Sequence, residues 1–208
     1  LASNEVLTIN GDEENDVWIG TFGAGIDRWN KETNKITHYQ NKSKKTNGLG
    51  SDYVNAILSV PGDDLWVGNM EYLSRLKKET GQFENFNSNS RNLEDVDAKS
   101  IQSICRGRDG LIWLGTGNGI KSFDPQTKAF THYYYDAGNP NGISDYTALS
   151  IYADSRDNIW VGTGSIAFNR FDKKTGLFTH YKNNVMDTTS ISSNIVYSVF
   201  EDSKHNLW

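Results

Sequence analysis

Five tryptophans recur at an almost constant interval, and this repeat constrains the fold more than any other feature of the sequence. Trp18, Trp66, Trp113, Trp160 and Trp208 are separated by 48, 47, 47 and 48 residues. Each later tryptophan is preceded by an aromatic residue exactly 27 positions upstream; these residues are Tyr39, Phe86, Tyr133 and Tyr181. A repeat of this length with few insertions is typical of the blades of a β-propeller, which hold four short strands each.

Each repeat predicts four strands. An apolar run such as residues 54–60 forms the innermost strand and ends in a turn rich in Asp, Gly and Asn. The tryptophan strand follows, then a Gly-Ile-x-x-Phe strand, then an outermost strand such as residues 130–133. The first four tryptophans are followed, after one apolar residue, by a glycine, which weakens a strand. We expect this glycine to allow close approach of an aromatic ring from a neighbouring blade.

The predicted fold class is all-β. We expect a β-propeller fragment of four four-stranded antiparallel blades plus half of a fifth, with a period of 47–48 residues. The partial propeller covers residues 1–208, with blades at approximately 4–40, 52–87, 99–135 and 146–182 and a half blade at 193–208. Both ends supply an innermost strand, so we expect a piece of a longer protein whose uncovered apolar faces promote self-association.

Composition and charge narrow the classes of partner. The chain has 21 Lys and Arg against 26 Asp and Glu, with both signs scattered, so we expect no nucleic acid partner. No apolar run is long enough to span a bilayer, which places any membrane anchor outside this fragment. Cys105 is the single cysteine and lies in an apolar run, so we expect a small buried side chain rather than a reactive thiol.

The histidines and glycines predict no catalytic, metal or cofactor site. His38, His132 and His180 occupy one repeat position on separate outer strands, so they cannot converge on one metal, and His205 lies in a solvated turn. Residues 115–119 read Gly-Thr-Gly-Asn-Gly but lack a following helix, so they predict a hairpin turn rather than a phosphate-binding loop.

Ligand contact is predicted at one end of the blades, where the turns between second and third strands meet the loops that lead into innermost strands. Aromatic side chains and amides there suit a sugar, because apolar ring faces stack and hydroxyls need directed partners. Each candidate could equally be an ordinary turn residue. The candidate ligand-binding residues are Tyr53, Met70, Glu71, Tyr72, Asn118, Tyr146 and Ser165.

The repeat resembles the two-component regulator propeller repeat. The resemblance rests on Asp-x-x-Gly/Asn-x-Ile/Leu-Trp-Val/Leu-Gly-Thr, then Gly-Ile-x-x-Phe-Asp, then Thr-x-x-Phe-Thr-His-Tyr, with the best copies at residues 109–124 and 157–163. It covers essentially the entire chain. The resemblance implies the periplasmic sensor region of a hybrid two-component protein of Bacteroides-type bacteria, which detects oligosaccharides and carries its histidine kinase elsewhere. The motif itself marks the scaffold and not a binding site.

Three functions remain open. The first is a non-catalytic sensory module without cofactors, which detects glycan fragments or another small ligand. The second is a propeller enzyme such as a polysaccharide or streptogramin lyase. The third is an adhesion or protein-binding scaffold. A downstream transmembrane stretch followed by kinase motifs would favour the first.

Overall fold

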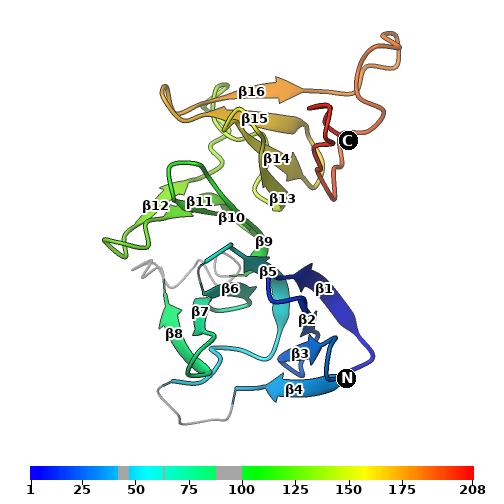
Figure 1. Ribbon diagram of the computed structural model, residues 1–208. Coiled ribbons are helices and arrows are strands. Elements are labelled where there is room, and N and C mark those ends of the chain that lie inside the picture. Colours follow the sequence, from blue (N-terminus) through cyan, green and yellow to red (C-terminus); the bar gives the residue numbers. More distant parts are fainter. Residues whose placement is uncertain (42–46, 63, 88–99) are drawn as a thin grey trace. The chain divides into compact units, whose positions relative to one another are not determined.

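The computed structural model describes residues 1–41, 47–62, 64–87 and 100–208, which contain sixteen β-strands and no helix. These residues divide into two compact units (Figure 1). Unit 1 comprises the described residues up to Asn87 together with Ser100 and Ile101, and unit 2 comprises Gln102–Trp208. No helix in the described part of the chain could cross a membrane.

Unit 1 holds two four-stranded antiparallel sheets in which the strands follow chain order (Figure 1). The first sheet consists of β1 (Val6–Gly11), β2 (Asp16–Thr21), β3 (Ile26–Asn30) and β4 (Lys35–Tyr39). The second sheet consists of β5 (Val54–Ser59), β6 (Leu65–Asn69), β7 (Leu73–Lys77) and β8 (Gln82–Phe86). Strand β5 contacts both β1 and β2, so the first strand of one sheet covers the sheet before it.

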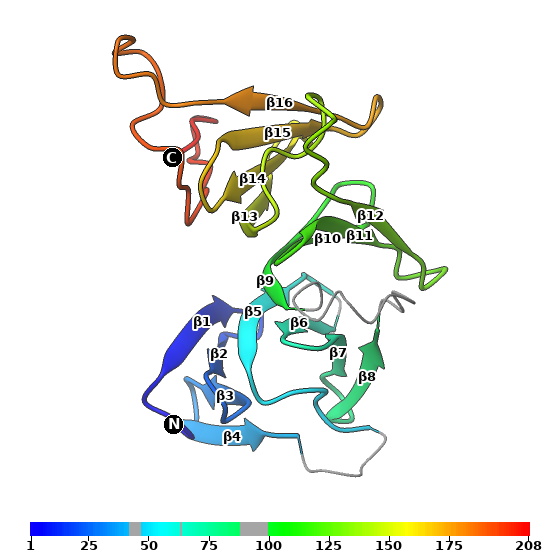
Figure 2. The same ribbon diagram turned by 180° about the vertical axis from the view of Figure 1, so that it is seen from behind.

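Unit 2 holds two further sheets of the same kind (Figure 2). One consists of β9 (Ile101–Arg106), whose first residue belongs to unit 1, β10 (Ile112–Thr116), β11 (Gly119–Phe123) and β12 (Phe130–Tyr133). The other consists of β13 (Ala148–Ala153), β14 (Ile159–Thr163), β15 (Phe168–Asp172) and β16 (Leu177–Tyr181). The predicted all-β class with four four-stranded antiparallel sheets is confirmed. The expected start of the third sheet at residue 99 lies outside the described residues.

The two aromatic landmarks of each repeat pack on each other. Trp18, Trp66 and Trp113 are fully buried in the second strands of their sheets. The ring centroids of Trp18 and Tyr39 lie 5.8 Å apart, and those of Trp113 and Tyr133 lie 5.9 Å apart. The same pairing recurs in the other two sheets. Each sheet therefore repeats one aromatic contact between its second and fourth strands, with partners 20 or 21 residues apart.

A carboxylate closes the hairpin between the first and second strands in three repeats. The indole Nε1 of Trp18 donates to Asp12 at 2.7 Å, that of Trp160 donates to Asp154 at 2.8 Å, and that of Trp208 donates to Asp202 at 3.0 Å. The third repeat has Gly107 at this position, and Trp113 Nε1 has no acceptor among the described residues. The turn is therefore held by an aspartate six residues before the tryptophan in the first, fourth and fifth repeats, whereas the second and third repeats have Val60 and Gly107 at this position.

The glycine after each tryptophan does mark a close approach, but the expected aromatic neighbour is wrong. A Cβ at Gly115 would lie 2.8 Å from the carbonyl oxygen of Ala148 and would also meet Ser103 Oγ. A Cβ at Gly68 would meet the Ile101 side chain, the first residue of β9. At both glycines the approaching group belongs to the first strand of the next sheet and is not an aromatic ring.

The predicted half blade at 193–208 differs from the expectation of a regular innermost strand. The structure shows a hairpin in which Glu201 and Leu207 form a single bridge and Phe200 exchanges two backbone hydrogen bonds with Trp208. Residues 195–199 are not assigned to a strand. Within that stretch only the Val196 N–H is hydrogen-bonded to another backbone group, the carbonyl of Thr163. A strand needs such bonds along its length.

Candidate functional site

The turns of each antiparallel sheet gather at the two ends of its strands. We call the edge with the turns between second and third strands, and with the segments that lead into first strands, the 2–3 edge. We call the opposite edge, with the turns between first and second and between third and fourth strands, the 1–2 edge. All seven predicted ligand residues lie at the 2–3 edge of their sheets, four of them in unit 1 and three in unit 2.

Tyr53 lies immediately before β5 and is exposed. It forms an antiparallel bridge with Phe22, which lies in the turn after β2, and their ring centroids are 4.9 Å apart at 81°. Phe22 is also exposed. The two rings therefore form an edge-to-face aromatic pair at the surface, with the turn of one sheet meeting the loop that leads into the next, as predicted for this edge.

Met70, Glu71 and Tyr72 form the turn between β6 and β7. The amide N–H groups of Glu71 and Tyr72 both donate to Asn69 Oδ1, at 3.0 and 2.7 Å, which fixes the turn. Met70 and Glu71 are exposed, whereas Tyr72 is half-buried. A Cβ at Gly50 would meet the Tyr72 ring, so this ring already packs on backbone. Met70 and Glu71 are consequently more available to a ligand than Tyr72 is.

Asn118, Tyr146 and Ser165 follow one another along the 2–3 edge of unit 2. The carbonyl of Tyr146 accepts the N–H of Gly119, next to Asn118, at 2.5 Å. Ser165 Oγ donates at 2.7 Å to Oδ2 of Asp145, the neighbour of Tyr146. The Tyr146 side chain is 58% exposed and its ring centroid lies 4.4 Å from that of Tyr135. Unit 2 therefore presents a second aromatic pair flanked by a hydroxyl and a carboxylate.

Sequence reasoning missed one member of each aromatic pair. Phe22 stands four residues after Trp18, the same repeat position that Met70 holds after Trp66. That alignment was available in the sequence and would have pointed to Phe22. Tyr135 follows the outer strand β12 and carries no repeat signal, so only the structure shows that it contacts Tyr146.

Two cavities open at the 1–2 edge, where no ligand residue was predicted. The cavity in unit 2 has a volume of about 340 Å³ and lies between the β13–β14 and β15–β16 turns; it is lined by Arg156, Asn158, Arg170 and Lys174 among others. The cavity in unit 1 has a volume of about 310 Å³ and is lined mostly by acidic residues, including Glu13, Glu14, Asp64 and Glu79. Charged side chains line both cavities.

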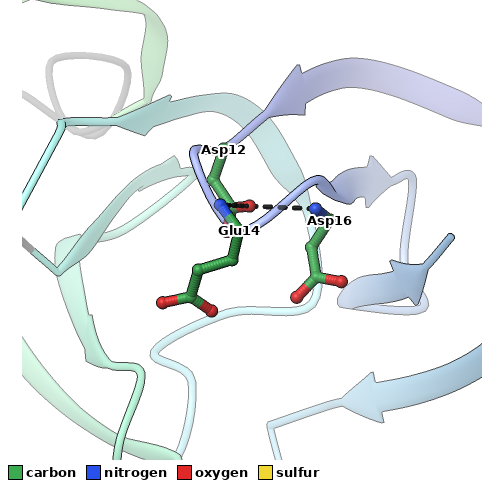
Figure 3. A group of neighbouring side chains, drawn as sticks. All are labelled: Asp12, Glu14 and Asp16. Carbon is green, nitrogen blue, oxygen red and sulfur yellow. Dashed lines mark hydrogen bonds between the residues drawn. The ribbon is translucent and has the colours of Figure 1, made fainter. Parts of the chain in front are cut away.

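Three carboxylates cluster at the turn between β1 and β2 (Figure 3), and one of them, Glu14, also lines the unit 1 cavity. Asp12, Glu14 and Asp16 each offer an oxygen, and these oxygens lie within 4.8 Å of one another. The protein's own cations already bind them. Arg28 Nε donates to Asp16 at 2.5 Å, Arg28 Nη2 lies 3.1 Å from Glu14, and Lys78 Nζ lies 3.1 Å from Asp12.

Asp12 carries several of these interactions at once. Its Oδ1 accepts hydrogen bonds from the backbone N–H groups of Glu14 and Asp16, each at 3.0 Å. Its Oδ2 accepts hydrogen bonds from Trp18 Nε1 and Lys78 Nζ. Burial raises the pKa of Asp12, but the hydrogen bonds from Trp18, Lys78 and the backbone outweigh burial and hold the pKa below its usual value of 3.8. The cluster is therefore an ion-paired turn whose carboxylates are committed to protein donors.

A serine, a histidine and a glutamate meet in unit 2 in an arrangement that superficially resembles a catalytic triad. Ser155 Oγ lies 2.9 Å from His205 Nδ1, and Glu201 Oε1 lies 3.3 Å from the same nitrogen. Ser155 Oγ also donates directly to Glu201 Oε1 at 2.7 Å. A triad needs the serine and the carboxylate on opposite ring nitrogens, so that the imidazole can take a proton from one side while the other side orients it. This geometry therefore supplies no relay.

The other histidines lie where the sequence predicts, on fourth strands. His38 Nδ1 pairs at 2.6 Å with the buried Asp27, and His180 Nε2 lies 2.8 Å from the carbonyl of Gly142. His132 lies in β12 beside Tyr134. Each ring is engaged with a group of its own sheet or of the loop beside it, and all three lie on outermost strands.

Comparison with known proteins confirms the repeat. The family model for the two-component regulator propeller matches residues 95–118 and 142–165. No curated protein matches the sequence.

Solved structures share the fold at low sequence identity. The extracellular domain of a hybrid two-component system from B. thetaiotaomicron matches with a TM-score of 0.80 and 18% identity over 99% of this chain and 26% of that one. A second such domain from the same organism matches with a TM-score of 0.59 and 21% identity over 100% and 32%. A catalytically inactive variant of virginiamycin B lyase from Staphylococcus aureus, with quinupristin, matches with a TM-score of 0.72 and 18% identity over 100% and 65%. This chain thus spans about a quarter to a third of the extracellular domains that it resembles.

Proposed function

Because this chain carries two-component regulator propeller repeats, we propose that it forms part of the periplasmic, ligand-sensing region of a hybrid two-component signal transduction protein. In this proposal the chain binds its ligand without transforming it. The ligand class is a glycan fragment, and the kinase that reads the signal lies elsewhere in the protein.

The observation that carries the proposal is one aromatic pair at the 2–3 edge of each unit, in which Tyr146 is exposed and its partner Tyr135 is half-buried in unit 2. Phe22 with Tyr53 in unit 1 and Tyr135 with Tyr146 in unit 2 present ring surface next to polar groups. Exposed aromatic faces next to directed hydrogen-bonding groups suit a sugar, whose ring is apolar on its faces and polar at its rim. Glu71 is exposed in the β6–β7 turn, and the Ser165 hydroxyl lies beside Asp145, so both residues offer such groups at this edge.

The histidine positions support the non-catalytic part of the proposal over a lyase. Propeller lyases are the main enzymatic alternative, because one matches this chain in structure. General acid–base chemistry needs a side chain within hydrogen-bond reach of the substrate. His38 and His180 are held on outer strands, and His205 is held at the 1–2 edge by Ser155 and Glu201.

Calorimetric titration tests the proposal. The complete extracytoplasmic region is titrated with a panel of oligosaccharides, and the same mixtures are followed by chromatography. Saturable binding with intact ligand is the expected result. Formation of a product would replace the sensor proposal by the lyase alternative. If neither binding nor product is detected, glycan sensing is overturned in favour of a protein-binding scaffold.

Substitutions then test the choice of edge. Tyr53→Ala and Glu71→Gln should weaken binding of the identified sugar about tenfold each, because each removes a stacking or hydrogen-bonding group from the surface. Leu177→Ala is the matched control, since Leu177 is equally exposed but lies at the 1–2 edge. Unchanged affinity in both test variants would refute the 2–3 edge as the binding surface.

A further inference from the structure

An arginine recurs at one position of the third strand, directly across from the tryptophan. Trp18 pairs with Arg28, Trp66 with Arg75 and Trp160 with Arg170 in the registers of their sheets. The residue two positions before the tryptophan faces this arginine. It is an aspartate in the first two sheets, Asp16 and Asp64, but Asn158 in the fourth.

The aspartates neutralise their arginines. Arg28 Nε donates to Asp16 at 2.5 Å, and Arg75 Nε lies 2.8 Å from Asp64. Both guanidinium groups also lie over the ring of the tryptophan, at 5.3 and 5.5 Å from its centroid. A guanidinium remains charged at any physiological pH, so a half-buried one needs a counter-charge or water.

Arg170 lacks this counter-charge. The Asn158 side chain turns to Asp154 instead, where its Nδ2 donates to Oδ2 at 2.8 Å. Among the described residues, no carboxylate lies within ion-pair distance of the Arg170 guanidinium, and the same is true of Arg156. Because Asn158 stands where the first two sheets have an aspartate, the positive charge of Arg170 has no carboxylate partner among the described residues.

Both unpaired arginines line the cavity of about 340 Å³ at the 1–2 edge. Its lining holds four basic and two acidic side chains, and the acids are already engaged. Asp157 pairs with Lys173 and accepts the Arg108 N–H at 2.9 Å, while Asp172 accepts the Lys174 N–H at 2.8 Å. The corresponding cavity of unit 1 has the opposite balance, with four acids and two bases.

We propose that Arg170 and Arg156 form a binding site for the oxyanion group of a small ligand, the chemistry shared by sulfate, phosphate and carboxylate. The guanidinium fork donates two parallel N–H bonds to such a group, which suits this site better than a point charge would. The cavity has the volume for one such group with part of the molecule that carries it. The site lies at the opposite edge from the proposed sugar surface and does not depend on it.

Titration of the whole chain with sodium sulfate tests the proposal, with ionic strength held constant by exchange against sodium chloride. Parallel titrations with phosphate and acetate show which oxyanion the site prefers. Backbone amide NMR shifts report binding and locate it, and saturable shifts in the turns around Asn158 and Lys174 are the expected result. Absence of saturation with all three anions would overturn the proposal.

Three variants make the test specific to the arginine. Arg170→Gln should weaken sulfate binding about tenfold or more. Asn158→Asp restores the carboxylate that the first two sheets have, and should compete with the anion for Arg170 to a similar extent. Arg28→Gln removes the same charge from a paired arginine and should leave binding unchanged. Equal weakening in Arg28→Gln and Arg170→Gln, or full binding in a folded Asn158→Asp protein, would refute the site.

Discussion

The glycine that follows each tryptophan allows a sharp test of how adjacent sheets pack. In Gly115→Ala the new Cβ would lie 2.8 Å from the carbonyl oxygen of Ala148, a distance that real Cβ contacts essentially never show. The Ser103 hydroxyl, which it would also meet, can rotate away, but the Ala148 carbonyl is backbone and cannot. Strand β13 must therefore move away from β10, with which it is in contact.

The cost follows from two opposing effects. Overpacking a well-packed core by one methyl group lowers the free energy of unfolding by about 1–3 kcal/mol. Alanine recovers roughly 0.5–1 kcal/mol because it restricts the unfolded chain more than glycine does. We therefore expect a net loss of about 1–2 kcal/mol, which corresponds to a fall of about 3–6 °C in Tm for a protein of this size.

Gly164→Ala is the matched control, because Gly164 lies just beyond the end of β14 and its added Cβ would make only ordinary contacts, the nearest at 3.7 Å. Urea unfolding followed by circular dichroism compares the two variants with the parent protein. The control should equal or slightly exceed the parent in stability. A Gly115→Ala protein as stable as the control would refute the claim that the sheets approach each other through this glycine.

Three further predictions follow from side chains described above. Asp154→Ala should lower the free energy of unfolding by about 2 kcal/mol at pH 7, because Asp154 accepts hydrogen bonds from Trp160, Asn158 and the backbone. Burial raises the pKa of Asp154, but these hydrogen bonds outweigh burial and hold the pKa below 3.8. The difference in free energy of unfolding between Asp154→Asn and the parent, measured in urea, should therefore shrink as the pH falls below 4. A difference that stays constant with pH would contradict this. Burial raises the pKa of the Cys105 thiol to about 12, so it should react with Ellman's reagent only in unfolded protein, and rapid stoichiometric labelling of the folded chain would show otherwise. Ile9 is 64% exposed on the edge strand β1, so we propose self-association at high concentration that Ile9→Lys reduces; light scattering that finds the parent monomeric throughout would exclude it.

The sheet layout could be predicted from the sequence because one contact repeats in every sheet. Trp18 and Tyr39 are 21 residues apart, Trp113 and Tyr133 are 20 residues apart, and each pair packs in the structure. Periodicity reports such contacts within one repeat. It does not report the partner of the recurring glycine, which lies in the next repeat. The first strand of the following sheet approaches this glycine, in place of the expected aromatic ring.

The candidate site was predictable only in part. The edge that holds Tyr53 and Tyr146 follows from strand order, since antiparallel strands place their turns at two ends. The pairing of Tyr146 with Tyr135 does not follow, because Tyr135 lies in an irregular segment after β12. The unpaired charge of Arg170 is in principle visible in an alignment of the repeats. The strand register is needed to show that Asn158 faces Arg170 as Asp16 faces Arg28.

The contact between neighbouring sheets also has a consequence for the order in which the chain is made. The glycine of each sheet meets a residue only 33 or 34 positions further along, from Gly20 with Val54 to Gly162 with Val196. A ribosome adds about 5–20 residues per second, so the residue that covers each glycine is synthesised only about 2–7 s after the glycine itself. Among the described sheets the residue that covers this glycine lies in the next repeat, so the surface beside the glycine is exposed to other nascent chains for seconds only.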